Sequence, residues 1–144
     1  DPASPAYAAK LKAYEDREVV MHKQRLFPEF PDWPILCFYP MNKRRGESLN
    51  WYSESFERRA AMMREHGMIG RHYTGKVTQI ISGSIGYDDW EWGVDLFADD
   101  PVVFKKLIYE MRFDEVTHRF GEFGDFYIGI QVPVDELMRR TLVD

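Results

Sequence analysis

The chain of 144 residues is 44% hydrophobic and 30% charged, which is ordinary for one compact domain with a sizeable core. Its formal charge of −5 argues against a general nucleic-acid-binding protein, and no apolar run approaches the roughly 18 residues that a membrane-spanning helix needs. Cys37 is the only cysteine, which excludes an intrachain disulfide framework and a cysteine-based zinc site. These features predict a cytoplasmic protein without a nucleic-acid partner or a membrane span.

Residues 1–34 are predicted to form a helix and a linker that continue from an upstream segment. Apolar side chains recur on one side of a helix over residues 6–22. The prolines of segment 27–34 then favour extended or turned backbone, because proline lacks an N–H donor and disfavours helix at the residue before it. A new domain is therefore expected to begin near residue 35.

Residues 35–144 predict one α+β domain. The first helix of this domain has Ser53 as a suitable N-cap and Gly67 as its expected end. The second and third strands are joined by turn residues and should form an antiparallel hairpin. The predicted elements are strands 35–41, 76–85, 91–97 and 126–132 and helices 54–66, 101–111 and 134–142. The order β-α-β-β-α-β is the ferredoxin-like arrangement of the dimeric α/β-barrel type, here with an N-terminal helical extension.

A tyrosine, a methionine and a lysine stand two residues apart at the end of the predicted strand 35–41. Side chains alternate between the two faces of a strand, so Tyr39, Met41 and Lys43 should project to the same side. Tyrosine is common in half-buried strands, and packing is the simpler explanation for Tyr39 alone. A phenol beside a cation also suits a ligand that bears carboxylates, such as an iron porphyrin.

His66 and Gln79 each allow a functional and a structural explanation. An imidazole next to a glycine at a helix end suits an axial iron ligand, but it also complements the helix dipole, and spacing alone favours the second explanation. Gln79 interrupts an apolar strand and serves either as a core hydrogen-bonding group or as a group that faces a ligand. The other histidines lack metal-binding spacing, which disfavours a zinc hydrolase.

Four separated motifs carry the most specific information in the sequence. They occupy segments 38–45, 65–71, 88–93 and 109–116. Taken together, they resemble the coproheme decarboxylases, a family within the chlorite dismutase superfamily, and specifically its C-terminal haem-binding half. The likeness covers nearly the whole chain, and it raises His66 and Tyr39 above their packing explanations.

The resemblance implies an enzyme of coproporphyrin-dependent haem biosynthesis. Such an enzyme uses hydrogen peroxide to decarboxylate two propionates of iron coproporphyrin III, which is called coproheme, and yields haem b in the last step of the pathway. Coproheme is then both substrate and redox centre, and a ferrochelatase is a candidate partner. The family chemistry proceeds through a tyrosyl radical.

The same resemblance assigns roles to individual residues. It makes His66 the proximal iron ligand, Tyr39 the radical tyrosine and Lys43 the residue that assists the second decarboxylation. Met41 is expected to line the same pocket. Weaker assignments are Arg25, Arg71 and Thr117 as propionate contacts, Gln79 as a distal residue, His22 as a base for peroxide and Glu115 as the acceptor for the proximal imidazole.

Family members usually carry two tandem ferredoxin-like halves, whereas this chain resembles only the second. We therefore expect a fragment whose N-terminal half is absent or supplied as a separate chain. Because family members form rings of subunits, usually pentamers, a homo-oligomer is expected as well.

Two alternatives to the decarboxylase stay open. One is a porphyrin-binding module without turnover. The other is chlorite dismutase or peroxidase chemistry on the same scaffold. Chlorite dismutases depend on a distal arginine and lack this tyrosine–lysine strand, so Tyr39 and Lys43 count against the second alternative.

Overall fold

The computed structural model describes residues 4–141, which belong to two compact units, Asp1–Phe30 and Pro31–Asp144. The first unit holds one helix, α1 (Pro5–Leu26), and none of its side chains is buried. No helix within residues 4–141 is long and apolar enough to cross a membrane.

Helix α1 is longer than the predicted helix over residues 6–22. It ends at Leu26 because Pro28 disfavours the helical conformation at the preceding residue, Phe27, whose φ and ψ are −135° and 68°. Arg25 therefore lies on the last turn of the helix and not in the linker.

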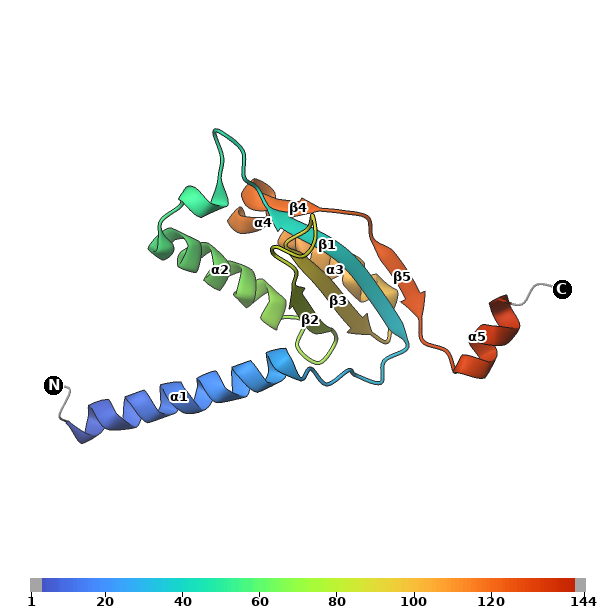
Figure 1. The fold of residues 1–144 in the computed structure, drawn as a ribbon, viewed down its shortest axis with the longest axis horizontal. Coiled ribbons are helices and arrows are strands. Elements are labelled where there is room, and N and C mark those ends of the chain that lie inside the picture. Colours follow the sequence, from blue (N-terminus) through green and yellow to red (C-terminus); the bar gives the residue numbers. More distant parts are fainter. Residues whose placement is uncertain (1–3, 142–144) are drawn as a thin grey trace. The chain divides into compact units, whose positions relative to one another are not determined.

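The second unit contains the sheet and its covering helices (Figure 1). Its strands are β1 (Ile35–Lys43), β2 (Thr78–Gly83), β3 (Trp92–Ala98), β4 (Gly121–Phe123) and β5 (Tyr127–Ile130). Its helices are η1 (Trp51–Ser53), α2 (Phe56–Arg71), α3 (Pro101–Met111), α4 (Glu115–Phe120) and α5 (Val134–Thr141).

All strand pairs are antiparallel, and the sheet order is β2-β3-β1-β4, with β5 also paired to β1. This order confirms the predicted ferredoxin-like α+β fold. The predicted last strand, 126–132, is wrong in its extent, because two short strands, β4 and β5, run along the same edge of β1. The interruption lies opposite Pro40, which has no N–H to offer the ladder and instead accepts a hydrogen bond from the Gly124 N–H at 2.9 Å.

One face of the sheet is covered by α3. The register pairs Cys37 with Leu96 and Tyr39 with Val94, so these four side chains share a face, and all four are buried. Buried apolar residues of α3 pack against them: Phe104, Leu107 and Met111. The predicted common face of Tyr39, Met41 and Lys43 is therefore the helix-covered face.

Helix α2 differs from its prediction at both ends. It begins after Ser55 and not after Ser53, because the short helix η1 occupies Ser53. It also continues through Gly67 and Gly70 to Arg71, since hydrogen bonds and packing of the whole helix outweigh the weak helix propensity of the two glycines. His66 therefore lies inside α2. Because it is not at the end of the helix, complementing the helix dipole does not explain its presence.

Helix α4 was not predicted from the sequence. Asp114 caps it, with Oδ1 accepting a hydrogen bond of 2.8 Å from the Thr117 N–H. A second core cluster joins this helix to η1 and α2 through Trp51, Met62, Val116 and Phe120. This packing holds the start of α4 beside α2, where His66 lies.

The sheet core should be sensitive to truncation at Leu96, whose side chain is fully buried. Leu96→Ala is expected to lower the free energy of unfolding by about 3 kcal/mol, because the cavity that it leaves can relax only in part. Ile81→Ala, at a 51% exposed position of the neighbouring strand, is the control and should cost less than about 1 kcal/mol. Urea denaturation with an unchanged m-value measures the difference, and equal losses would contradict the assigned core.

Candidate functional site

His66 projects from α2 and is oriented by a buried carboxylate. Its Nδ1 lies 2.8 Å from Oδ2 of Asp114, whose side chain is 1% exposed, and 3.4 Å from the Thr117 hydroxyl. An ionised carboxylate can only accept, so Nδ1 carries the proton and donates, and the lone pair is left on Nε2. The His66 side chain is 26% exposed. Within residues 4–141, no hydrogen-bonding group engages Nε2.

This arrangement is the one that metal-binding histidines adopt. A histidine that ligates a metal commonly donates its other ring N–H to a carboxylate, which fixes the ring and makes the ligating nitrogen more basic. In the described part of the chain, no group of three or more His, Cys, Asp or Glu side chains is placed to hold a metal ion. His66 could therefore supply one protein ligand, its Nε2, to a metal.

Tyr39 is buried on the helix-covered face of the sheet, within an aromatic cluster. Its ring stacks on Phe126 at a centroid distance of 4.4 Å and meets the edge of Phe123 at 5.8 Å. Burial raises the pKa of the Tyr39 phenol well above its usual value, and the nearby Cys37 adds to this effect, while Arg112 opposes it. The phenol therefore keeps its proton in neutral and mildly alkaline solution.

Lys43 is the buried cation of the site. Its side chain is 9% exposed, and its ammonium lies 5.2 Å from the ring centroid of Trp51. Burial lowers the pKa of Lys43, whereas the charges of Asp114 and Glu91 act to raise it. Because Asp114 also binds His66, the field of one carboxylate acts on both residues.

Arg59, on α2, is the second cation of the site. Its guanidinium carbon lies 5.9 Å from the Trp51 centroid. Its Nε is buried, and no acceptor within residues 4–141 bonds to it. A buried donor without an acceptor is costly, so a ligand that brings an anionic oxygen would satisfy it.

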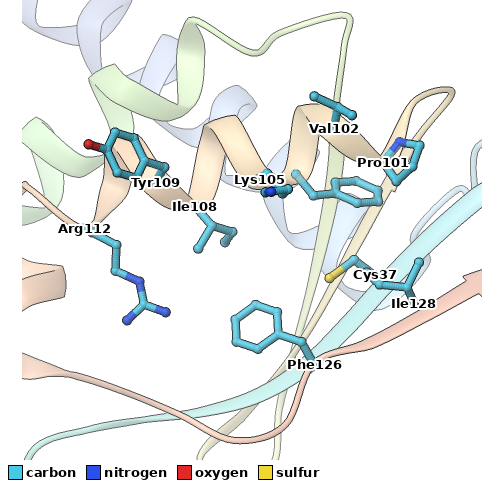
Figure 2. Close-up of a pocket in the computed structure, with 10 residues that line it drawn as sticks. Cys37, Pro101, Val102, Lys105, Ile108, Tyr109, Arg112, Phe126 and Ile128 are labelled. Atoms are coloured by element: carbon cyan, nitrogen blue, oxygen red, sulfur yellow. The ribbon is translucent and has the colours of Figure 1, made fainter.

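A cavity of about 540 Å³ lies between α3 and the strands β1 and β5 (Figure 2). Its lining is mostly apolar, and Lys105 and Arg112 supply the two cations at its wall. Phe126 lines this cavity and also stacks on Tyr39, so one aromatic ring stands between the phenol and the cavity. Burial raises the pKa of the Cys37 thiol, which lines the same cavity and is therefore a poor nucleophile.

The structure brings some of the predicted residues together. Tyr39, Met41 and Lys43 follow one another on the helix-covered face of β1, and Thr117 contacts the His66 ring. Gln79 pairs with Leu96 in the register and so shares this face, although its side chain is exposed near the edge of the sheet.

For three other predicted residues, the structure gives only their exposure and their place on a helix. Arg71 ends α2 and is exposed. His22 and Arg25 are exposed on α1, in the first unit, and His22 lies 3.9 Å from Glu18 on the same helix. The roles predicted for all three stay predictions.

The acceptor for the imidazole is Asp114, and the prediction of Glu115 was wrong. Glu115 instead forms ion pairs with Arg58 and Arg119, both at 2.7 Å. An aspartate at the N-cap followed by an acidic residue in the first turn, Glu115, is a recognisable helix start, and this signal would have found α4 and its cap.

Arg112 was also missed by the sequence analysis. It follows α3, and its guanidinium carbon lies 5.0 Å from the Phe123 centroid, inside the aromatic cluster around Tyr39. Arg112 stands in the motif 109–116, but its position, one residue after the end of a helix, did not indicate a role of its own.

Comparison with known proteins identifies the family of this chain. The sequence profile of the family described as chlorite dismutase matches residues 4–132. The chain therefore belongs to the chlorite dismutase family. Among curated proteins, it is 56% identical over 124 residues to coproheme decarboxylase from Staphylococcus carnosus (strain TM300), covering 86% of this chain and 49% of that protein. It is 59% identical over 115 residues to coproheme decarboxylase from Staphylococcus saprophyticus, covering 80% of this chain and 46% of that protein.

Solved structures agree with the fold. A haem-binding protein from Thermus thermophilus is 48% identical with a TM-score of 0.78, covering 97% of this chain and 51% of that one. Chlorite dismutase from Candidatus Nitrospira defluvii, solved with imidazole, is 22% identical with a TM-score of 0.68, covering 78% of this chain and 46% of that one, and supports the fold alone. The chain spans about half the length of the curated relatives that it matches.

Proposed function

We propose that the protein containing this chain is a coproheme decarboxylase, which uses hydrogen peroxide to convert two propionates of iron coproporphyrin III into vinyl groups and forms haem b. The observation that carries the proposal is the His66–Asp114 pair, because it leaves one imidazole nitrogen available for a metal. The high identity to proteins named coproheme decarboxylase supports the choice of substrate.

The residues present fit an iron porphyrin. A porphyrin supplies four equatorial nitrogens, so a single histidine completes the attachment from the protein, as His66 would through Nε2. When bound, the iron porphyrin supplies the redox chemistry with peroxide. The His66 tautomer and ring orientation are held by Asp114, and the Thr117 hydroxyl next to Nδ1 makes that residue a further support for the ring.

Carboxylates on the porphyrin match the cations of this region. The buried ammonium of Lys43 and the unsatisfied Nε of Arg59 both require anionic or acceptor oxygens. Arg112 can attract a further carboxylate near Tyr39. Arg25 and Arg71 remain proposed propionate contacts, Met41 a pocket residue, and His22 and Gln79 proposed groups on the peroxide side.

Tyr39 is suited to hydrogen-atom transfer. Because burial holds the proton on its phenol, oxidation removes an electron and a proton together and leaves a neutral radical. Each propionate must lose carbon dioxide, one proton and two electrons to become a vinyl group, and one peroxide accepts the two electrons as it becomes water. Lys43, whose lowered pKa makes proton release easier, is proposed to hold the reacting carboxylate or to exchange its proton in the second step.

The proposal extends to the whole protein. We propose a homo-oligomer, with the rest of the relatives' length supplied in the same polypeptide or by a separate chain. A ferrochelatase, as an enzyme that inserts iron into the porphyrin, would supply the substrate, and the cytoplasm is the proposed location.

Mass spectrometry of the bound porphyrin tests the proposed function. Adding hydrogen peroxide in steps to the protein with iron coproporphyrin III should give two successive losses, each equal to one carboxyl group and one hydrogen atom, and end at haem b. Tight binding with no change of mass would overturn the proposal in favour of a non-catalytic porphyrin-binding module. Rapid oxygen release from chlorite, with the porphyrin unchanged, would overturn it in favour of chlorite dismutase chemistry.

A further inference from the structure

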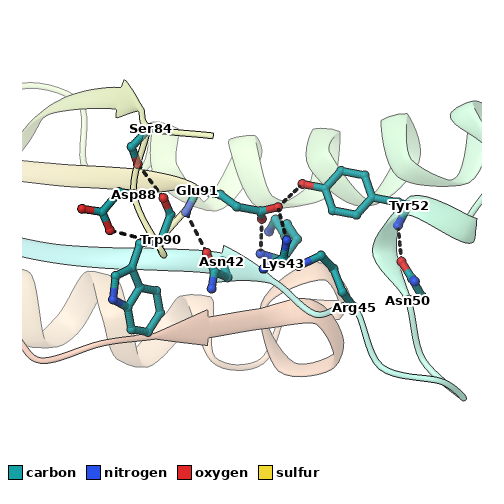
Figure 3. Close-up of polar contacts among 9 residues, drawn as sticks. All are labelled: Asn42, Lys43, Arg45, Asn50, Tyr52, Ser84, Asp88, Trp90 and Glu91. Atoms are coloured by element: carbon teal, nitrogen blue, oxygen red, sulfur yellow. Dashed lines mark hydrogen bonds and ion pairs between the residues drawn. The ribbon is translucent and has the colours of Figure 1, made fainter. Parts of the chain in front are cut away.

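Glu91 is a buried carboxylate that joins three parts of the second unit (Figure 3). It immediately precedes β3 and is 5% exposed. Its Oε2 accepts a hydrogen bond from the Lys43 main-chain N–H at 2.9 Å, and its Oε1 accepts one from the Tyr52 hydroxyl at 2.7 Å. Its own N–H donates to Oδ1 of Asn42 at 2.7 Å.

Through its bond to Tyr52, Glu91 also holds the residues around the Lys43 ammonium. Tyr52 stands next to Trp51 in η1, and the Trp51 ring is the surface on which the Lys43 ammonium lies. Burial, together with the bond to Glu91, raises the pKa of Tyr52 to about 12, so the hydroxyl stays a donor. One carboxylate thus fixes both the backbone of Lys43 and the segment that carries its aromatic neighbour.

The Lys43 ammonium has no close counter-ion among residues 4–141. No carboxylate oxygen of this part of the chain forms an ion pair with it, although the charges of Glu91 and Asp114 act on it from a greater distance. Both oxygens of Glu91 are occupied by other donors. The Lys43 side chain is thus held in place, and its positive charge is partly compensated by the two carboxylates, but its ammonium hydrogens stay available to an anionic ligand.

We infer that Glu91 is a positioning residue, which with Tyr52 holds the Lys43 ammonium in place for a carboxylate of the substrate. The identity of that carboxylate rests on the proposed function, whereas the positioning of Lys43 rests on the geometry alone. The simpler alternative is that Glu91 only fastens the hairpin between β2 and β3 to β1. A suitable experiment must therefore report on Lys43 itself.

Glu91→Gln and Tyr52→Phe separate the two explanations. Glutamine keeps the shape of Glu91 but can accept through only one atom, so either the Lys43 N–H or the Tyr52 hydroxyl loses its partner. The ion pair between Glu91 and Arg45, at 3.8 Å, is lost as well. Ser84→Ala is the matched control, because the Ser84 hydroxyl bonds the Trp90 carbonyl at 2.7 Å in the same hairpin without contacting Lys43. Circular dichroism and urea denaturation select the conditions under which every variant is folded.

The first readout needs no turnover. Acetic anhydride is applied to each folded variant, and the acetylation rate of Lys43 is measured by peptide mass spectrometry against the exposed Lys76. Glu91→Gln should raise the relative rate at Lys43 by about tenfold and Tyr52→Phe by a smaller factor, because a looser side chain presents its neutral amine, the form that reacts, to the reagent more often. Glu91→Gln also removes a charge that raises the pKa of Lys43, so the increase in Tyr52→Phe, which keeps that charge, reports the positioning alone. The double variant should match Glu91→Gln, since Tyr52 acts through Glu91. An unchanged rate in Glu91→Gln, as in Ser84→Ala, would overturn the inference.

The second readout is single turnover with iron coproporphyrin III and peroxide. Glu91→Gln should slow the second decarboxylation by about tenfold while the first changes by less than about threefold, because only the Lys43-dependent step is affected. Equal slowing of both steps would instead assign Glu91 to general stability. Absence of turnover in the unmodified protein would contradict the proposed function, and the acetylation rates would still decide the role of Glu91.

Discussion

Tyr39→Phe is expected to abolish decarboxylation and to leave porphyrin binding nearly unchanged. The substitution removes only the hydroxyl, and the ring contacts with Phe123 and Phe126 can persist. A phenyl ring has no O–H hydrogen to give up, so the rate of the first decarboxylation should fall by roughly a thousandfold or more, which corresponds to about 4 kcal/mol of barrier. Mass spectrometry of the porphyrin after peroxide addition measures the rate, and the Soret band measures binding.

Tyr127→Phe is the matched control for this experiment. Tyr127 pairs with Phe38, on the opposite face of the sheet from Tyr39, and its side chain is exposed. This variant should decarboxylate at the normal rate. Full turnover by Tyr39→Phe would remove the phenol from the mechanism, and loss of activity in both variants would point to a general effect of tyrosine oxidation or of stability.

His66→Ala is expected to cause the second large effect, because it would remove the proposed protein ligand to the porphyrin iron. Without the imidazole, porphyrin affinity should fall by about a hundredfold, and imidazole added to the solution should restore the absorption spectrum by filling the space. Asp114→Asn is expected to have a similar but smaller effect. Asparagine can still cap α4 through its carbonyl oxygen, but its amide cannot accept the Nδ1 proton, so affinity should fall about tenfold with helix α4 intact.

His72→Ala serves as the control for His66→Ala. His72 follows the last residue of α2, and its side chain is exposed. Its replacement should leave the titration with iron coproporphyrin III unchanged. Equal affinities of His66→Ala and the unmodified protein would show that His66 is not the iron ligand.

Much of the fold could be predicted because its signals are local. Alternation along strand 35–41 correctly placed Tyr39, Met41 and Lys43 on one face, and Pro101 at a first helical position marked the start of α3. The ends of α2 could not be predicted in this way. Gly67 is a typical helix stop in isolation, but the contacts of α2 with α3 and α4 continue the helix past it.

The sequence could predict the main residues of the candidate site but not the residues that position them. His66 and Tyr39 stand in motifs that resemble a family, whereas the choice between two adjacent acids, Asp114 and Glu115, depends on the turn that starts α4. That turn directs Asp114 inward and leaves Glu115 among arginines on the surface of α4. Glu91 stands in the motif 88–93, but nothing in the sequence indicated its contacts, because its partners lie 39 and 48 residues away in the chain.

The buried ammonium of Lys43 has a consequence for folding as well as for chemistry. Since burial lowers the pKa of Lys43 in the folded protein, the folded state holds this proton less firmly than the unfolded state does. While Lys43 is charged it therefore opposes folding, and this opposition fades as the pH rises above the lowered pKa of Lys43 in the folded state. A carboxylate of the proposed substrate, bound at Lys43, would relieve the same cost without deprotonation. Such a ligand would bind the folded state in preference to the unfolded state and would therefore stabilise the fold.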